Sequence, residues 1–461
     1  MKRLLGVLSL ASVACVGQAS PQQASQTPAT PARVTAYDVD SALGKLFALP
    51  LWPNFDPRNT PVAIFDGETT VLFRHPGEPA GYYSLSSHQG VFARPGRDSL
   101  VNSNTSVTLA GVPTATVMLR QDGQSAREWA AVTAHEIFHV FQRSRHPSWT
   151  ANEAELFTYP VDDAGALALR RAETVALRRA LGARRADSVR CWTAAFARAR
   201  RARFAAIGAA AAYERGTELN EGLANYVQLR ALERPVLLPA ADFPPEQVRA
   251  RSYAIGAAIG QLLDRAAPAW RDTLESAPPF PNVSLDGLLE RMSSSEAEGS
   301  PALRCTASAA DSAAGVERAR ADVRALVAHR EQARAALLAQ PGWRVIIDAD
   351  ASPLFPQGFD PLNVSRVSAT EVLHTRFLKL GNDRGIVELL GQAAVTEGRA
   401  GQHPLFNGVR RVTIPGLSAL AVRDSSGVLL IQATGFQARL RNAAADTTGT
   451  TISVRAARAG P

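Results

Sequence analysis

The sequence is poor in lysine, cysteine and methionine, and it has no long hydrophobic segment after its first residues. Only three of its 50 basic residues are lysines, so the net charge of +8 comes almost wholly from arginine. Such a bias has a simpler cause in genome base composition than in nucleic-acid binding, and the arginine runs lack the interleaved aromatic residues of a nucleic-acid groove. We therefore expect no nucleic-acid partner and no transmembrane segment.

Several catalytic motifs are also missing. The chain has no GxSxG elbow, no GxxxxGK[ST] loop, no CxxC pair and no GxGxxG turn. These absences argue against α/β-hydrolase, nucleotide-phosphate, thiol-redox and dinucleotide chemistry. What remains is a chain of 461 residues, 46% hydrophobic and 20% charged, which is the composition of a globular protein with about three domains.

The N-terminus has the features of a secretory signal. Lys2 and Arg3 precede an apolar stretch over residues 4–16, and small residues near Ala19 offer a cleavage site. We expect residues 1–19 to be a signal peptide. The prediction is export from a bacterial cell, to the periplasm or the extracellular medium.

A serine-, proline-, glutamine- and threonine-rich segment, residues 20–33, is predicted to be a flexible leader. Cleavage after Ala14 is the alternative to cleavage near Ala19. It would leave Cys15 first, as in a bacterial lipoprotein, and would give the chain a lipid anchor.

Removal of the signal leaves two cysteines, Cys191 and Cys305. In an oxidising compartment such a pair is expected to form one disulfide. The alternative is two buried free thiols.

Hydrophobic periodicity predicts an α+β fold in several parts. Strand-like patterns cover residues 62–119, a helical pattern runs from Ser125 to about Leu263, and strand patterns return after Gly342. Residues 62–73 are predicted to form two strands joined by a turn at Asp66-Gly67. The expected division is residues 34–265, a strand-rich part and a helical domain with an Ala/Arg-rich insertion at about 160–212; 266–317, a connector; 318–340, one helix; and 341–461, a β-rich C-terminal module.

The insertion carries paired arginines beside apolar residues at helical spacing. We interpret the pairs as a solvated helix face; they are Arg170-Arg171, Arg178-Arg179 and Arg184-Arg185.

One motif points directly to chemistry. The segment from His135 to His139 reads HEIFH, which is HExxH, and its two histidines share one face of a helix. The sequence SARE from Ser125 predicts a capping box that starts this helix, and Pro147 follows its end. Two imidazoles one turn apart suit Zn²⁺, and Glu136 is placed to act on a metal-bound water. The alternative is a pair of core histidines.

Catalytic zinc usually takes three protein ligands. The elongated HExxHxxGxxH pattern is absent, because Gln142 and Arg145 occupy the positions of its glycine and third histidine. The best third ligand is Glu221 in the predicted helix ELNEGLANYV, where Gly222 would let another helix approach closely. Other carboxylates that could take this role are Glu153, Glu155 and Glu218.

HEIFH followed by LNEGLANYV resembles the gluzincin zinc metallopeptidases, in particular their aminopeptidase N-like branch. The resemblance covers residues 125–264. It implies that residues 34–265 form a metallopeptidase-like catalytic domain, that His135, His139 and Glu221 bind Zn²⁺, and that Glu136 is the general base. The substrate would be a peptide or protein.

The same branch has a tyrosine on a later helix that stabilises the oxyanion of the reaction. Tyr253 in the segment SYAIG matches that position, although Ile255 replaces the motif's lysine. A phenol that donates to charge formed only in the transition state is physically sensible. The alternatives are a core tyrosine at this position, with Tyr226 or Tyr213 in the catalytic role.

Two departures from the branch limit what the resemblance implies. The stretch between His139 and Glu221 is far longer than in the branch, and the GxMEN segment that anchors a free amino terminus is absent. Exopeptidase specificity therefore does not carry over, and the choice between endopeptidase and exopeptidase stays open. The alternative function is an exported, non-catalytic binding or scaffold protein that retains the metal site.

Overall fold

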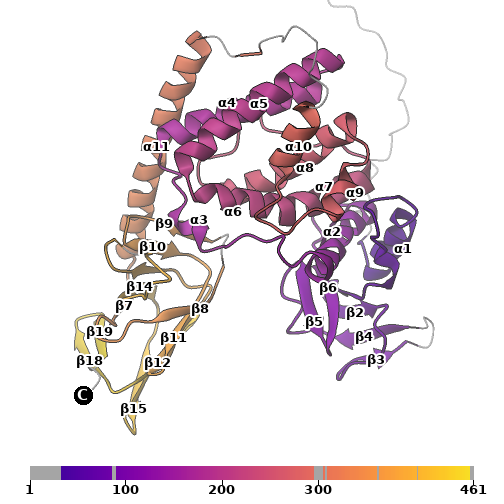
Figure 1. Cartoon of the computed structure of the whole chain (residues 1–461). Helices are drawn as coiled ribbons and strands as arrows, with labels where there is room; N and C mark the ends of the chain where they lie inside the picture. The colour runs from indigo at the N-terminus through magenta and orange to yellow at the C-terminus, as the bar shows by residue number, and fades with distance from the viewer. Residues whose placement is uncertain are drawn as a thin grey trace, which may run out of the picture.

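The computed structural model describes residues 33–85, 90–294, 305–306, 309–360, 363–401 and 403–456. Within these ranges the chain has the predicted α+β fold, with an N-terminal sheet, a central group of helices and two C-terminal sheets (Figure 1). The expected signal peptide, Cys15 and all but the last residue of the expected leader lie outside the described residues. Among the helices described, none has both the length and the apolar character needed to cross a membrane.

The N-terminal sheet has six strands. They are β1 (Val62–Phe65), β2 (Thr69–Phe73), β3 (Tyr83–Ser84), β4 (Val91–Pro95), β5 (Thr105–Leu109) and β6 (Val112–Met118). Their order across the sheet is β3-β4-β2-β1-β6-β5, and only β1 and β6 pair in parallel. Strands β1 and β2 form the predicted hairpin, whose turn contains Gly67 at a φ of 104°. Strand β5 is left at the edge of the sheet.

Helix α2 (Ala126–Arg145) packs against this sheet and carries the HExxH motif. The predicted capping box starts it: the Ser125 side chain accepts from the Glu128 N–H, and the Glu128 carboxylate accepts from the Ser125 N–H at 2.9 Å. The apolar side of α2, which includes Phe138, is buried in the main core. Helix α1 (Ala36–Leu46) packs against α2. A short 3₁₀ turn, η1 (Pro57–Asn59), follows α1 in the chain and leads into the sheet.

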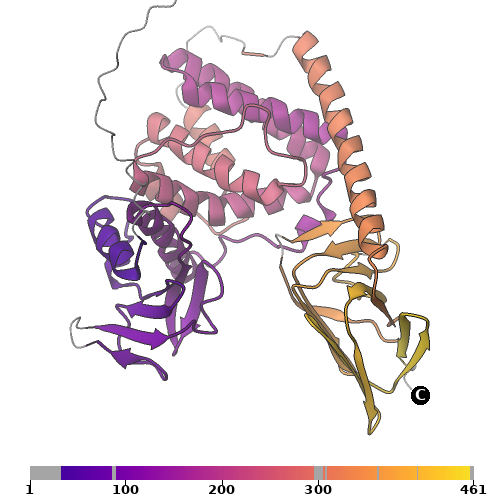
Figure 2. The ribbon, with the colours of Figure 1, turned by 180° about the vertical axis from the view of Figure 1, so that it is seen from behind.

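The central part is helical. Its elements are α3 (Glu155–Thr158), α4 (Ala164–Gly182), α5 (Ala186–Ile207), α6 (Ala210–Thr217), the π-helical turn η2 (Glu218–Gly222), α7 (Leu223–Leu232), α8 (Val248–Ala266), α9 (Trp270–Glu275) and α10 (Leu285–Ser294). Helices α4 and α5 lie side by side on the side of this part away from the N-terminal sheet (Figures 1 and 2). The expected connector, residues 266–317, contains helices α9 and α10. It is also part of the main core, since Trp270 and Leu288 bury their side chains with those of α2.

Several arginines of the central helices are buried in what we call the ionic cluster. Its four arginines, each at most 3% exposed, pair with five carboxylates. The pairs are Arg170 with Asp242; Arg200 with Glu173, Glu218 and Asp286; Arg203 with Glu173 and Glu214; and Arg251 with Glu173, Glu214 and Asp242. A buried arginine requires such partners, since an unpaired charge is costly away from water.

The prediction of a solvated arginine face is therefore wrong for Arg170, while Arg179, Arg184 and Arg185 are exposed as expected. Periodicity could not show this difference. The partner of Arg170 lies 72 residues along the chain, in a segment without regular structure.

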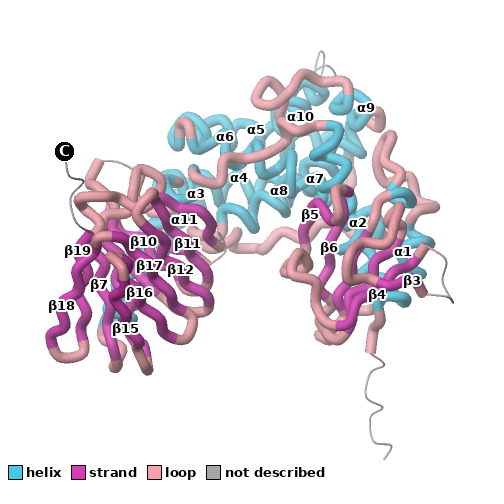
Figure 3. Tube along the Cα trace, turned by 90° about the horizontal axis from the view of Figure 1, so that it is seen from below, coloured by secondary structure: helices cyan, strands magenta, loops and turns pink. Residues whose placement is uncertain are grey.

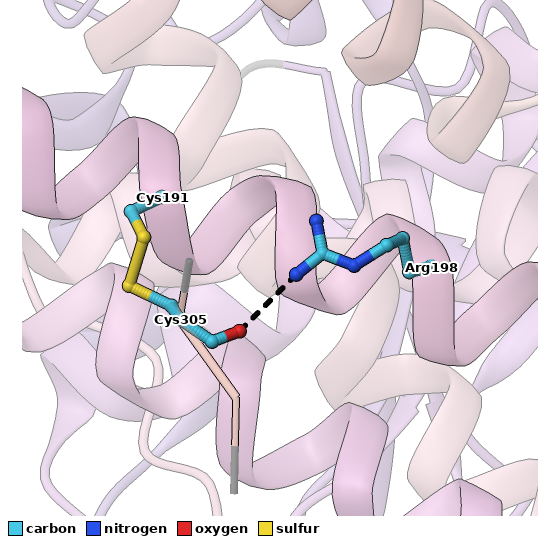
Figure 4. The surroundings of a disulfide bond; sticks show 3 residues. All are labelled: Cys191, Arg198 and Cys305. Atoms are coloured by element: carbon cyan, nitrogen blue, oxygen red, sulfur yellow. Dashed lines mark hydrogen bonds between the residues drawn. A yellow bond between two sulfur atoms is a disulfide. The ribbon is translucent and has the colours of Figure 1, made fainter. Parts of the chain in front are cut away.

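Cys191 on α5 and Cys305 form the expected disulfide, with Cα atoms 5.6 Å apart (Figure 4). The free-thiol alternative is thus not what the structure shows. The Arg198 guanidinium donates to the Cys305 carbonyl oxygen at 3.1 Å. Together the two contacts attach the segment before the last long helix to the surface of α5.

The C-terminal part begins with helix α11 (Ala309–Leu338), which starts earlier than the predicted 318–340 helix and ends close to it. The strands that follow are β7 (Trp343–Asp348), β8 (Phe355–Phe359), β9 (Val364–Arg366), β10 (Glu371–His374), β11 (Phe377–Asn382), β12 (Gly385–Leu390), β13 (Ala394–Glu397), β14 (Arg411–Leu417), β15 (Ala421–Ser425), β16 (Val428–Ala433), β17 (Phe436–Arg441), β18 (Ala443–Thr448) and β19 (Thr451–Ala456). They form the expected β-rich module (Figure 3).

This module consists of two sheets with one shared core. The strand orders are β18-β19-β7-β14-β13-β10-β9 and β15-β16-β17-β12-β11-β8. Phe157 of α3 belongs to the same core, with its ring centroid 5.2 Å from that of Phe359 and 5.8 Å from that of Phe406. The helical part is thereby packed onto the module, which places β9 and Asp360 beside the cavities described below.

Candidate metal centre

The two histidines of the HExxH motif face the same point from adjacent turns of α2. Their Nε2 atoms are 3.1 Å apart, and both residues are buried. This is the arrangement that the four-residue spacing predicts, because positions i and i+4 of a helix lie one above the other.

Glu221 joins them from the other side. Its Oε2 atom is 3.1 Å from Nε2 of His139 and 3.5 Å from Nε2 of His135. Tetrahedral zinc holds nitrogen and oxygen ligands at about 2.0–2.1 Å, which puts ligand atoms about 3.3 Å from one another. The predicted convergence of the three residues is confirmed, and the spacing of their candidate ligand atoms fits one small metal ion. We call His135, His139 and Glu221 the triad.

The backbone that presents Glu221 is unusual. Residues 218–222 form a single π-helical turn between α6 and α7, which are otherwise continuous with it. Such single π-helical turns are frequently found at functional sites. The other proposed third ligands have partners elsewhere. Glu218 pairs with Arg200 in the ionic cluster, and Glu153 pairs with Arg249. Glu155, the first residue of α3, forms hydrogen bonds with Asn152 and Thr158.

Gln142 connects the two metal-binding elements. Its side-chain oxygen lies 2.8 Å from Nδ1 of His139, and its amide nitrogen donates to the carbonyl oxygens of Leu219 and Asn220, each at 2.9 Å. An acceptor at Nδ1 fixes the proton there and leaves Nε2 free to bind metal. In the sequence, Gln142 was considered only because it occupies the glycine position of the HExxHxxGxxH pattern. Its position three residues after His139 nevertheless places it on the same helix face.

Electrostatics keep the third ligand ionised. Burial acts to raise the pKa of Glu221, but the hydrogen bonds from His135 and His139 outweigh it and lower the pKa far below its ordinary value. Burial likewise acts to lower the pKa of His139, and the Glu221 carboxylate reverses the effect, so that this pKa is raised. Glu221 is thus held as an anion, which is the charge state that a carboxylate needs in order to bind a metal ion.

Glu136 lies beside the triad without a partner of its own. Its side chain is buried, and no hydrogen bond or ion pair joins it to any residue that the structure describes. Burial raises its pKa. Because Glu136 lines the cavity in front of the triad, its carboxylate is free to accept a proton there.

Tyr253 lies on the same cavity, in the second turn of α8. Its ring stacks over that of His135, with centroids 6.1 Å apart and planes 17° from parallel. Burial, with the neighbouring Glu221 carboxylate, raises the pKa of Tyr253 far above its ordinary value, so the phenol keeps its proton. A protonated phenol beside the triad can donate a hydrogen bond, which is the role predicted for it.

The other two tyrosines are engaged elsewhere. The Tyr226 hydroxyl bonds both carboxylate oxygens of Asp264 at 2.8 Å, and that of Tyr213 bonds Glu153 at 3.2 Å. Neither lines the cavity. Of the three candidates, only Tyr253 faces the triad.

Arg249 is a site residue that the sequence did not reveal. One side of its guanidinium donates to Oε1 of Glu221 at 2.8 Å, and the other side pairs with Glu153. It stands four residues before Tyr253, so the helical spacing of α8 was the available signal. Arg249 neutralises the oxygen of Glu221 that faces away from the histidines.

The cavity in front of the triad has a volume of about 390 Å³. Its walls come from α2, η2, α7 and α8, from Asn104 and the edge strand β5, and from Asp360 of the C-terminal module. A cavity of this size beside the three candidate ligands leaves room for a water molecule and a substrate.

No protein-family model, curated protein or solved structure matches this chain. The resemblance to gluzincins therefore rests on the sequence motifs.

Proposed function

We propose that this chain is an exported zinc-dependent metallohydrolase that cleaves peptide bonds, with His135, His139 and Glu221 as metal ligands. The observation that carries the proposal is the placement of Glu136. A buried carboxylate without a partner, facing a cavity beside three convergent ligands, is what a general base requires and what a purely structural metal site does not.

The donor set suits the metal. Two imidazoles and one carboxylate, with one side open, are the ligands of catalytic zinc sites. A bound zinc ion would polarise a carbonyl group and lower the pKa of a water molecule beside it. The Cys191–Cys305 disulfide supports the proposed export, since such bonds persist in oxidising compartments.

The residues of the chain supply the remaining chemistry. Glu136 takes a proton from the attacking water at its carboxylate and passes it to the leaving amine nitrogen. Tyr253 donates its hydroxyl proton in a hydrogen bond to the substrate oxygen, on which negative charge develops. Arg249 and Gln142 hold Glu221 and His139 in place during these steps.

The experiment that tests the proposal combines metal analysis with digestion of a peptide library. Wild-type protein should contain about one zinc per chain and cut peptides. Glu136→Gln should retain zinc and lose activity by about 10²–10⁴-fold, because the size is kept and the base is removed. His139→Ala should lose both zinc and activity, whereas Glu317→Gln, on the exposed face of α11, should match wild type.

Two outcomes would contradict the proposal. Full activity in Glu136→Gln would remove the proposed base from the mechanism. Bound zinc without cleavage of any peptide would instead favour the binding or scaffold function.

A further inference from the structure

A second cavity, of about 290 Å³, lies next to the metal cavity, between the central helices and the C-terminal module. Its walls come from the segment around α3, from the first turn of α8, from α11 and from β9. Arg249 lines both cavities, so the two are separated by the residue that holds Glu221.

Three arginines line this second cavity, and two of them have partners. Arg366 donates to both carboxylate oxygens of Asp162, at 3.0 and 3.1 Å, and Arg249 is held between Glu153 and Glu221. Their charges are therefore balanced within the protein.

The third arginine, Arg330 of α11, has no such partner. It is only 9% exposed, and none of the described residues makes a hydrogen bond or an ion pair with its side chain. Its pKa is lowered, with burial as the main cause and Arg366 as the next. Of the carboxylates that act on it, Asp162 is occupied by Arg366, and Glu246 is exposed and forms no ion pair with it.

This arrangement is unfavourable, because burial removes much of the hydration of the Arg330 guanidinium without supplying a counter-charge, while the group still lines the cavity. Phe157 and Val161 make part of the wall apolar, and Glu246, the one carboxylate among the lining residues, is exposed. An arrangement of this kind is explained if the missing acceptor is supplied from outside. Planar guanidinium groups bind carboxylates in a two-bonded geometry, which also confers directional selectivity.

We propose that this second cavity binds a carboxylate group of a peptide ligand, with Arg330 as its anchoring cation. The proposal rests on the peptidase function proposed above and makes it more specific: the preferred substrates carry a carboxylate that enters beside Arg249 while the rest of the peptide occupies the metal cavity. The carboxylate comes either from an acidic side chain or from the C-terminus of the peptide.

Binding of fluorescent peptides to full-length Glu136→Gln protein tests the proposal without cleavage. Three peptides differ only in carboxylates: one is neutral and amidated, one has a free C-terminus, and one is amidated with a single glutamate. At least one acidic peptide should bind about ten- to a hundredfold more tightly than the neutral one, and the arm that does so identifies the source. Adding Arg330→Gln should abolish the difference, whereas adding Arg324→Gln, an exposed arginine on the same helix, should preserve it.

Thermal melting gives a second readout, which starts from the wild-type protein. An acidic peptide should raise the melting temperature of wild type more than the neutral peptide does. Arg330→Gln without peptide should melt no lower than wild type, because an unpaired buried charge has been removed. Equal affinity for all three peptides, or an unchanged preference in Arg330→Gln, would overturn the proposal.

The outcomes separate this proposal from the peptidase function. If His139→Ala loses zinc and still prefers acidic peptides, the carboxylate site stands on its own. If wild type cleaves neutral and acidic peptides with equal KM, the peptidase function stands and the carboxylate site fails. If both hold, Arg330→Gln in the active protein should raise KM for acidic substrates alone and leave kcat unchanged.

Discussion

Gly222 and Gly256 face each other where η2 crosses α8, so closely that a Cβ atom on either would stand 2.7 Å from the Cα of the other. The first follows the proposed metal ligand Glu221, and the second comes three residues after Tyr253. The predicted close approach at Gly222 is confirmed. This contact limits how the side chains of Glu221 and Tyr253 are placed relative to each other, because the two elements that carry them meet here.

Gly256→Ala should therefore separate the two helices. The added methyl group would also stand 2.8 Å from the Glu218 carbonyl oxygen, and backbone cannot yield as a flexible side chain does. We expect a loss of about 1–3 kcal/mol in the free energy of unfolding, together with weaker zinc binding. Gly44→Ala in α1, which has open space around it, should instead stabilise by up to about 1 kcal/mol. Equal stability of the two variants in urea unfolding would contradict this interpretation.

Gln142→Leu should weaken metal binding while keeping the three ligands. The substitution removes the acceptor that orients His139 and the donor that reaches the backbone of η2. Loss of such a supporting contact typically lowers metal affinity about 10–100-fold. Competition with a zinc chelator measures the effect, with Gln124→Leu in the loop before α2 as a control. An unchanged zinc affinity would show that Gln142 is only a packing residue.

Tyr253→Phe should lower turnover and leave zinc content and melting temperature nearly unchanged. A single donor to the developing oxyanion is worth about 3–4 kcal/mol in turnover, or 10²–10³-fold. Tyr226→Phe is a suitable control, because that hydroxyl bonds Asp264 and the residue does not line the cavity. If Tyr253→Phe turns over at the wild-type rate, the donor is another group on the cavity wall.

Reduction of the Cys191–Cys305 disulfide should destabilise the chain. The bond closes a loop of 114 residues, for which the chain-entropy account predicts about 4–5 kcal/mol. Thermal melting with and without a thiol reductant measures this loss. The double variant Cys191→Ser, Cys305→Ser should melt at the reduced protein's temperature and be insensitive to reductant. A wild type equally insensitive to reductant would mean that the bond contributes little.

The parts of the site that sequence predicted are those encoded locally. The capping box at Ser125, the paired histidines of α2 and the helix around Glu221 each depend on residues within one or two turns, so spacing alone reveals them. The disulfide followed from counting, because two cysteines allow one pairing. The hairpin at Gly67 could also be predicted, because its two strands and its turn are adjacent in the sequence.

The parts that sequence missed depend on partners far along the chain. Arg170 and Arg178 both belong to arginine pairs of α4. Arg170 is buried and forms an ion pair with Asp242, whereas Arg178 is only partly buried. Arg249 takes its role from Glu221 and Glu153, which come from two other elements. Such pairings are products of the folded arrangement, and hydrophobic periodicity does not encode them.

The ionic cluster connects the long stretch between His139 and Glu221 to the elements that carry the candidate metal centre. Arg200 of α5 pairs with Glu218, the first residue of the turn that presents Glu221, while Arg251 of α8 pairs with Glu173 of α4. A shortened chain without α4 and α5 would leave Glu218 and Arg251 buried with fewer counter-charges. Buried ion pairs thus connect both halves of the candidate metal centre to these helices, and we expect that trimming the chain between the two motifs would destabilise the centre.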